Sequence, residues 1–146
     1  MGARRKAREA ALQVLYQIEM TGSPAESAIS LFWREHPAVE EVQKFAQELV
    51  EGTLRSQKEI DQLLERHSTH WRLSRMAVVD RNLLRMAIFE LLYGRDVPVS
   101  VTLNEAIEIA KKFGTEESAP FINGVLDPLA KEVRTNDSLK PHGQVD

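Results

Sequence analysis

Apolar positions recur along the chain at intervals of three and four residues, a spacing typical of α-helices. The strongest run covers residues 77–93, where apolar side chains occupy almost the whole circumference of the predicted helix. Such a helix needs neighbours on several sides. It is short and contains charged residues, so it is not expected to span a membrane. We therefore expect residues 77–93 to form the central helix of the core, ending at Gly94.

Six further segments carry the same helical spacing and predict helices around the central one. They begin near positions 3, 24, 37, 56, 102 and 118, and the third and fourth of them could equally form one bent rod. Ser23 and Pro24 are expected as N-cap and first residue of a helix. Capping boxes are expected to open helices at Ser56 and Thr102. Residues 96–101 have β-branched side chains but no second strand to pair with, so an extended linker is expected.

These segments predict an all-α fold of about seven helices in a single domain that covers residues 1–134. Within the last helix, Pro128 lacks a backbone N–H and is expected to kink the helix or split it. Residues 135–146 are polar and are expected to form a disordered tail.

Signatures of catalysis are absent from the sequence. It has no glycine-rich phosphate loop and no nucleophile elbow, so we expect a binding protein and not an enzyme. The chain has no cysteine and no apolar signal segment at its start, which fits a cytoplasmic location. His67 and His70 have a spacing found in metal sites, but only Glu65 is nearby, so neither a metal nor another cofactor is expected. Trp71 is expected to anchor the core.

The start of the chain is the main candidate for a binding site. Four of the first eight residues are basic and none is acidic, although the net charge of the chain is −3: Arg4, Arg5, Lys6 and Arg8. A helical projection places Tyr16 opposite the buried stripe and close to Arg5, with Leu12 between Tyr16 and Arg8. Arginine binds phosphate and an aromatic face stacks on an unpaired base, so this flank is suited to RNA. A solvated basic terminus without function is the alternative.

Three stretches of the sequence resemble the NusB family of bacterial transcription antitermination factors. They are residues 4–16 (RRKAREAALQVLY), residues 79–87 (VDRNLLRMA) with 90–92 and 96–98, and residues 104–114 (NEAIEIAKKFG) with 118 and 121–127. They follow the order and spacing of the family and cover about residues 3–133. The resemblance implies two small helical bundles packed together, which would divide this chain into residues 3–55 and 56–134.

The resemblance also implies a non-enzymatic function in RNA binding. Family members bind the boxA element of nascent ribosomal RNA together with NusE, a small-subunit ribosomal protein, and join the complex that keeps RNA polymerase elongating. The RNA-binding residues implied for this chain are Arg4, Arg5, Lys6, Arg8, Tyr16, Lys111, Glu117 and Phe121. Asp80, Arg81 and Arg85 are implied at the NusE-facing surface, although the two arginines could instead form internal ion pairs.

Two other functions are compatible with the sequence. Some ribosomal RNA cytosine methyltransferases carry a NusB-like N-terminal domain, but the given residues include no α/β domain for a cofactor. The other alternative is a protein-interaction scaffold without RNA contacts. A scaffold would tolerate exchange of the N-terminal arginines for glutamate, whereas an RNA-binding protein would not.

Overall fold

The computed structural model describes residues 2–68, 72–94 and 96–139, with side chains as far as residue 133 in the last range. Within these residues the protein has seven α-helices and no strand, which confirms the predicted all-α fold. The helices are α1 (Ala3–Thr21), α2 (Ala25–Glu35), α3 (Glu40–Arg55), α4 (Gln57–His67), α5 (Val78–Tyr93), α6 (Val99–Phe113) and α7 (Ser118–Leu139), with a 3₁₀ helix (Leu73–Arg75) before α5. Among the described helices, none is long and apolar enough to cross a membrane.

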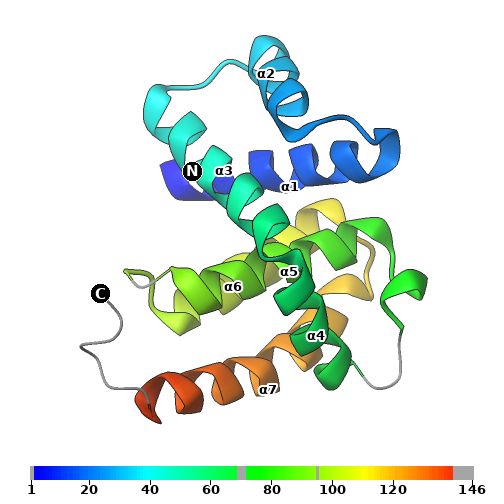
Figure 1. Cartoon of the computed structure of the whole chain (residues 1–146), viewed down its shortest axis with the longest axis vertical. Coiled ribbons are helices and arrows are strands. Elements are labelled where there is room, and N and C mark those ends of the chain that lie inside the picture. The colour runs from blue at the N-terminus through cyan, green and yellow to red at the C-terminus, as the bar shows by residue number, and fades with distance from the viewer. Residues whose placement is uncertain (1, 69–71, 95, 140–146) are drawn as a thin grey trace.

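The helices form two small bundles that meet at α5. Helices α1, α2 and α3 contact one another, and α5 packs with α4, α6 and α7 in the second group. Helix α5 also contacts α1 and α3, so it joins the two groups (Figure 1). Only Ser56 separates α3 from α4, and the two helices follow one oblique course through the molecule. The sequence pattern thus predicted both the central helix and its neighbours.

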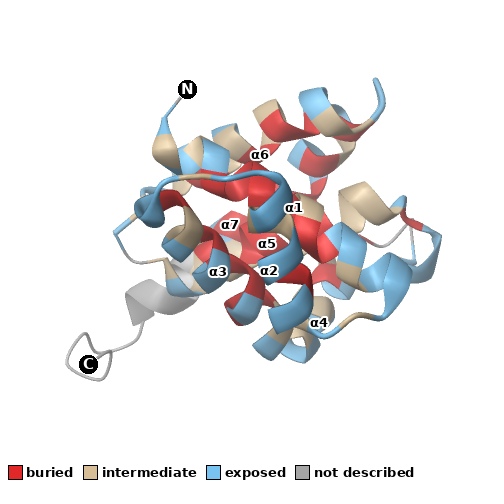
Figure 2. Ribbon diagram, turned by 90° about the horizontal axis from the view of Figure 1, so that it is seen from above, coloured by how far each residue is buried: buried red, intermediate tan, exposed pale blue. Residues whose placement is uncertain are grey.

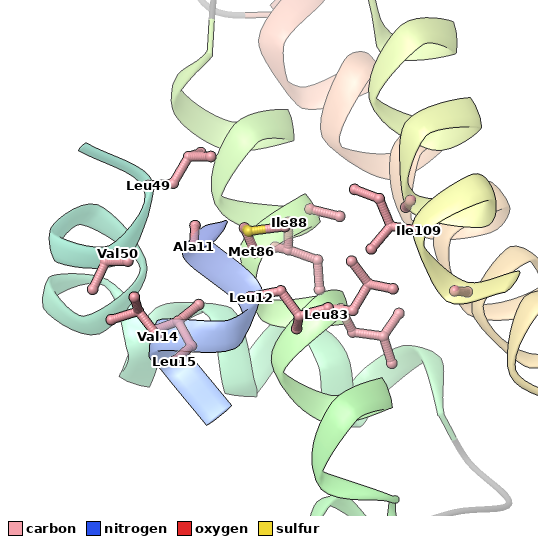
Figure 3. Packing of buried hydrophobic residues seen from close by; sticks show 14 of the residues in the cluster. Ala11, Leu12, Val14, Leu15, Leu49, Val50, Leu83, Met86, Ile88 and Ile109 are labelled. Carbon is pink, nitrogen blue, oxygen red and sulfur yellow. The ribbon is translucent and has the colours of Figure 1, made fainter. Parts of the chain in front are cut away.

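The hydrophobic core surrounds α5. Figure 3 shows Leu12 and Leu15 of α1, Leu49 of α3 and Ile109 of α6 on the helices around Leu83 of α5. All five side chains are almost fully buried. Burial of one such aliphatic side chain stabilises the fold by about 1.5–3 kcal/mol. Figure 2 shows buried positions along α5 and on the inner faces of its neighbours, with exposed positions outside.

Helix α6 begins earlier than the sequence pattern predicts. It starts at Val99, directly after Pro98, so residues 99–101 are helical and the prediction of a linker there is wrong. Pro98 fits this position because its fixed φ of about −60° suits a helix start and the first N–H groups have no helical partner anyway. Thr102 therefore lies inside α6 and is buried, so it cannot open a capping box. This leaves the side chain of Glu105 available for another partner.

The other two predicted caps are also absent. Pro24, and not Ser23, precedes the first residue of α2, and no side chain makes a cap hydrogen bond there. Ser56 precedes α4 but likewise makes no side-chain cap hydrogen bond. Glu59, the acid of that predicted box, instead accepts a hydrogen bond from the hydroxyl of Tyr93 at 2.5 Å.

Helix α7 passes through Pro128 without being split and continues to Leu139. Pro128 has no N–H to donate to the carbonyl of Gly124, four residues earlier. Both residues are exposed, so water can bind that carbonyl. The helix therefore extends beyond residue 134, where the sequence predicted a tail. Residues 140–146 of that tail, and the predicted positions of His70 and Trp71, lie outside the described residues.

Candidate nucleic-acid interface

The first turns of α1 face the start of α6, and a groove of about 440 Å³ lies between them. Arg5 donates from Nε and Nη2 to the two carboxylate oxygens of Glu105, at 2.5 and 2.6 Å. The hydrogen bonds from Arg5 hold the pKa of Glu105 below its ordinary value of 4.5, although burial opposes the shift. The side chain of Arg5 is 29 % exposed, and this pair uses two of its five N–H donors. The remaining donors can meet a phosphate at the open side of the groove.

Arg8 lies deeper, so the expectation that it shares an exposed flank with Tyr16 is wrong. Its Nε and Nη2 donate to the carboxylate of Glu90 on α5 at 2.7 and 2.8 Å, and only 4 % of each side chain is exposed. Burial lowers the pKa of Arg8, but the hydrogen bonds and charge of Glu90 outweigh burial and raise it overall. The helical projection did not include α5 and α6, which cover this side of α1. Arg8 therefore binds inside the protein and joins α1 to α5.

Arg4 and Lys6 remain accessible. Arg4 is 51 % exposed, lies 3.2 Å from Asp96 and places its guanidinium 4.7 Å from the ring centre of Phe45. Exposed ion pairs of this kind contribute only about 0–1 kcal/mol, so a phosphate can replace Asp96. Lys6 is exposed and makes no ion pair or side-chain hydrogen bond to the part of the chain that the structure describes. Arg4, Arg5 and Lys6 are thus the cations at the start of α1 that a ligand can reach.

Tyr16 lies on the outer side of α1 and is 37 % exposed, as the helical projection predicts. It lines a groove of about 500 Å³ together with Leu31 of α2 and Phe113 of α6. Leu12, which the helical projection places between Tyr16 and Arg8, also lines this groove but is only 2 % exposed. The tyrosine ring therefore remains a candidate platform for stacking, while Leu12 belongs to the core beneath it.

The second predicted RNA edge is formed by the end of α6 and the start of α7. Lys111 and Glu117 are exposed, and Phe121 is half-buried. Lys111 pairs with Glu108, three residues earlier on the same helix, at 3.1 Å.

Lys112 connects this second edge to α1. Its Nζ lies 2.8 Å from Oε1 of Glu9, while 54 % of the lysine side chain is exposed. The next residue, Phe113, lines the groove beside Tyr16. The end of α6 therefore lies against α1, a relationship that spacing within either segment does not reveal.

Arg81 and Arg85 are used inside the protein. Arg81 donates to the carbonyl oxygens of Leu73 and Met76 and pairs with Glu19. Arg85 binds both carboxylate oxygens of Asp61 at 2.8 and 3.0 Å. Both arginine side chains are only 11 % exposed, so both arginines form the internal ion pairs that were the alternative to a place at the NusE-facing surface.

Asp80, at the start of α5, is half-buried. Its Oδ1 atom is buried and has no hydrogen-bond partner among the described residues. An acid in the first turn of a helix is favoured by the helix dipole. Asp80 therefore differs from the two arginines, because it retains an acceptor that no described side chain satisfies.

Sequence reasoning missed the residues that hold the N-terminal helix in place. Glu90 and Glu105 accept the hydrogen bonds of Arg8 and Arg5, and Glu9 accepts that of Lys112. Glu105 fitted a capping box, which concealed its long-range role. Helices α5 and α6 together contain four acidic and four basic residues, and this composition gives no indication of which basic residue each acid meets.

An all-α protein whose first helix carries accessible cations at its start and an exposed aromatic ring about three turns further on has the features of a helical nucleic-acid-binding module. The sequence profile of the NusB family matches residues 5–131, so the chain belongs to the NusB family.

Similar proteins span nearly the whole chain. The transcription antitermination protein NusB of Myxococcus xanthus is 53 % identical over 138 residues, which cover 89 % of this chain and 96 % of that protein. The crystal form of T. maritima NusB matches with a TM-score of 0.82 at 40 % identity, covering 88 % of this chain and 91 % of that one. A crystal structure of the antitermination factors NusB and NusE in complex with dsRNA matches with a TM-score of 0.83 at 27 % identity. The match covers 90 % of this chain and 98 % of that one.

Proposed function

We propose that this protein is a transcription antitermination factor that binds boxA of nascent ribosomal RNA together with NusE and supports elongation by RNA polymerase. Membership of the NusB family supports this function, as do the antitermination relative and the similar complex of NusB, NusE and dsRNA. The observation that carries the proposal is the surface along α1 and α6, where Arg4, Arg5 and Lys6 are accessible on the helix that also exposes Tyr16. The function is binding and not catalysis, and its place is the cytoplasm.

RNA binding at this surface would combine charge and stacking. Arg4, Arg5 and Lys6 contact phosphates, and each phosphate that they neutralise releases condensed counterions. Tyr16 offers a ring face to an unpaired base, which is worth about 1–3 kcal/mol per base. Lys111, Glu117 and Phe121 extend the surface towards α7. Arg8 contributes by holding α1 against α5 and makes no direct contact.

NusE would contact the start of α5 through Asp80. Asp80 is only half-buried, so its side chain is partly accessible to NusE, while its buried Oδ1 atom has no partner among the residues described here. Arg81 and Arg85 would hold α5 in place through their internal ion pairs. Asp80→Lys should therefore weaken NusE binding in calorimetry, and an unchanged affinity would remove Asp80 from the interface.

The RNA proposal is tested by fluorescence anisotropy of a labelled single-stranded boxA RNA across a salt series, with NusE absent and present. Three phosphate contacts predict a slope of log affinity against log salt of about −2. Exchange of Arg4, Arg5 and Lys6 for glutamine should reduce both the affinity and the steepness of this slope. NusE should tighten binding to the native protein.

The matched control exchanges three exposed cations elsewhere, Lys44, Lys58 and Arg72, for glutamine. Both variants lose the same charge, so a general electrostatic effect would weaken RNA binding equally in both. Absence of RNA binding by the folded native protein, with and without NusE, would overturn the RNA function and favour a protein-interaction scaffold.

A further inference from the structure

Each N-terminal arginine is paired with an acid from α5, α6 or the segment between them, and the pairs differ in depth. They are Arg4–Asp96, Arg5–Glu105 and Arg8–Glu90. The first is largely exposed, the last is almost fully buried, and the Arg5–Glu105 pair lies between them with 29 % and 16 % of the side chains exposed. Only the intermediate pair is both tightly formed and within reach of a ligand.

Glu105 occupies the edge of Arg5 that an oxyanion would use. Both carboxylate oxygens accept from Arg5, at 2.5 and 2.6 Å, in the bidentate geometry with which arginine also binds phosphate. The pair lines the groove between α1 and α6, which is open enough to admit a ligand. A phosphate that binds this edge of the guanidinium must therefore displace Glu105.

We propose that Glu105 sets the RNA affinity of the surface through Arg5, because it competes with an RNA phosphate for that guanidinium. This inference rests on the proposed RNA-binding function. Glu105 acts as a positioning residue, since it determines where Arg5 points and how much of its charge a ligand meets.

The neighbouring Arg8 makes this exchange feasible. Its Nη1 atom lies 3.6 Å from Oε1 of Glu105, so the carboxylate keeps a cation beside it after Arg5 has turned to the RNA. Arg8 itself stays on Glu90, which holds it with two hydrogen bonds. Displacement of Glu105 therefore does not leave an isolated charge in a partly buried position, which would be costly.

The competition favours ligands with several phosphates. A single anion gains one contact with Arg5 and must break two charge-assisted hydrogen bonds. An RNA strand that already contacts Arg4 and Lys6 brings its next phosphate to Arg5 at a high effective concentration. Glu105 would thus suppress binding of small anions more strongly than binding of RNA.

The test measures binding of the single-stranded boxA RNA by native protein and by the Glu105→Gln variant across a salt series. Glutamine preserves the size of the side chain and removes its charge. We expect the variant to bind about three- to tenfold more tightly at moderate salt. The slope of log affinity against log salt should stay at about −2, because Arg5 contacts a phosphate in both complexes and Glu105 only competes for it.

Two variants separate this effect from a general loss of negative charge. Glu65→Gln makes the same charge change on the exposed face of α4 and should leave RNA affinity nearly unchanged. In the Arg5→Gln background, Glu105→Gln should give no gain, because the residue through which it acts is absent. Glu105→Asp keeps the charge but shortens the side chain, so it should give a smaller gain in RNA affinity. It replaces the glutamine variant as the test if that variant does not fold.

Each outcome bears on the inference. Equal or weaker RNA binding by Glu105→Gln, or the same gain in the Arg5→Gln background, would overturn it. The proposed RNA function would survive such a result provided that exchange of Arg4, Arg5 and Lys6 still weakens binding. Absence of RNA binding by the native protein and by every variant would overturn both.

Discussion

Arg8 and Glu90 form a bidentate ion pair between α1 and α5, with N–O distances of 2.7 and 2.8 Å and only 4 % of each side chain exposed. Removal of one partner leaves the other charge buried without compensation. We therefore expect Arg8→Met to lower the free energy of unfolding by about 3–5 kcal/mol, measured by urea denaturation followed by circular dichroism.

Two variants check the cause of this loss. Replacing both partners, Arg8→Met with Glu90→Leu, should recover most of the stability because no buried charge remains. Arg4→Met removes an exposed arginine and should cost only about 0–1 kcal/mol. If Arg8→Met kept native stability but lost RNA binding, Arg8 would contact RNA directly, as the sequence alone suggests.

Gly52 of α3 lies directly under the ring of Phe89 on α5. A Cβ atom at position 52 would fall 2.1 Å from Cζ of Phe89, much closer than atoms can approach. The half-buried ring of Phe89 must move to make room, so Gly52→Ala should destabilise the protein by about 1–3 kcal/mol in thermal unfolding.

Gly124 of α7 provides the matched control, because a Cβ atom there meets nothing within 4 Å. Glycine in a helix interior is about 0.5–1 kcal/mol less favourable than alanine. Gly124→Ala should therefore stabilise the protein. The same sign of change at both positions would show that contact with Phe89 does not control the effect at position 52.

Glu19 at the end of α1 should make stability depend on pH. Burial raises its pKa, but hydrogen bonds from Arg81 and Asn82 and the charges of Arg81 and Arg85 lower it more, so the folded pKa lies below the ordinary 4.5. A carboxylate of this kind adds stability that is complete above the unfolded pKa and is lost as pH falls through the folded one.

The variant Glu19→Gln should therefore be less stable than native protein at about pH 7, and the difference should shrink as the pH falls below about 4.5. Urea denaturation at several pH values measures this difference. Glu65→Gln, on the exposed face of α4, removes the same charge at neutral pH and is the control, which should keep nearly native stability at about pH 7. A Glu19→Gln deficit that stays constant down to about pH 3 would contradict ionisation of Glu19 as its source.

Sequence periodicity predicted the helices well because burial of an apolar stripe depends on local spacing. The central helix was identified from residues 77–93, and the structure has it at Val78–Tyr93. The start of α6 was missed because Val99 and Val101 are β-branched and suggest extended chain, whereas packing of the helix against α5 and α7 decides the outcome.

The candidate interface was predicted in part for a similar reason. A helical projection describes one helix alone, so it placed Tyr16 correctly on the outer side of α1. It failed for Arg8, because the acid that buries this arginine lies 82 residues further along the chain. Contacts at that separation depend on how the bundles pack, which local spacing does not encode.

Tyr16 provides the most direct test of stacking at the proposed RNA surface. Its ring is 37 % exposed, so Tyr16→Ala should leave the helical content unchanged in circular dichroism. Loss of one base–aromatic contact should weaken RNA binding by about 1–3 kcal/mol, without a change in salt slope because no charge is removed. Met20→Ala, one turn further along α1 and 57 % exposed, is the control and should bind RNA as the native protein does. Equal RNA affinity of the Tyr16→Ala and native proteins would mean that the bases lie elsewhere and that only the cations of α1 contact the RNA.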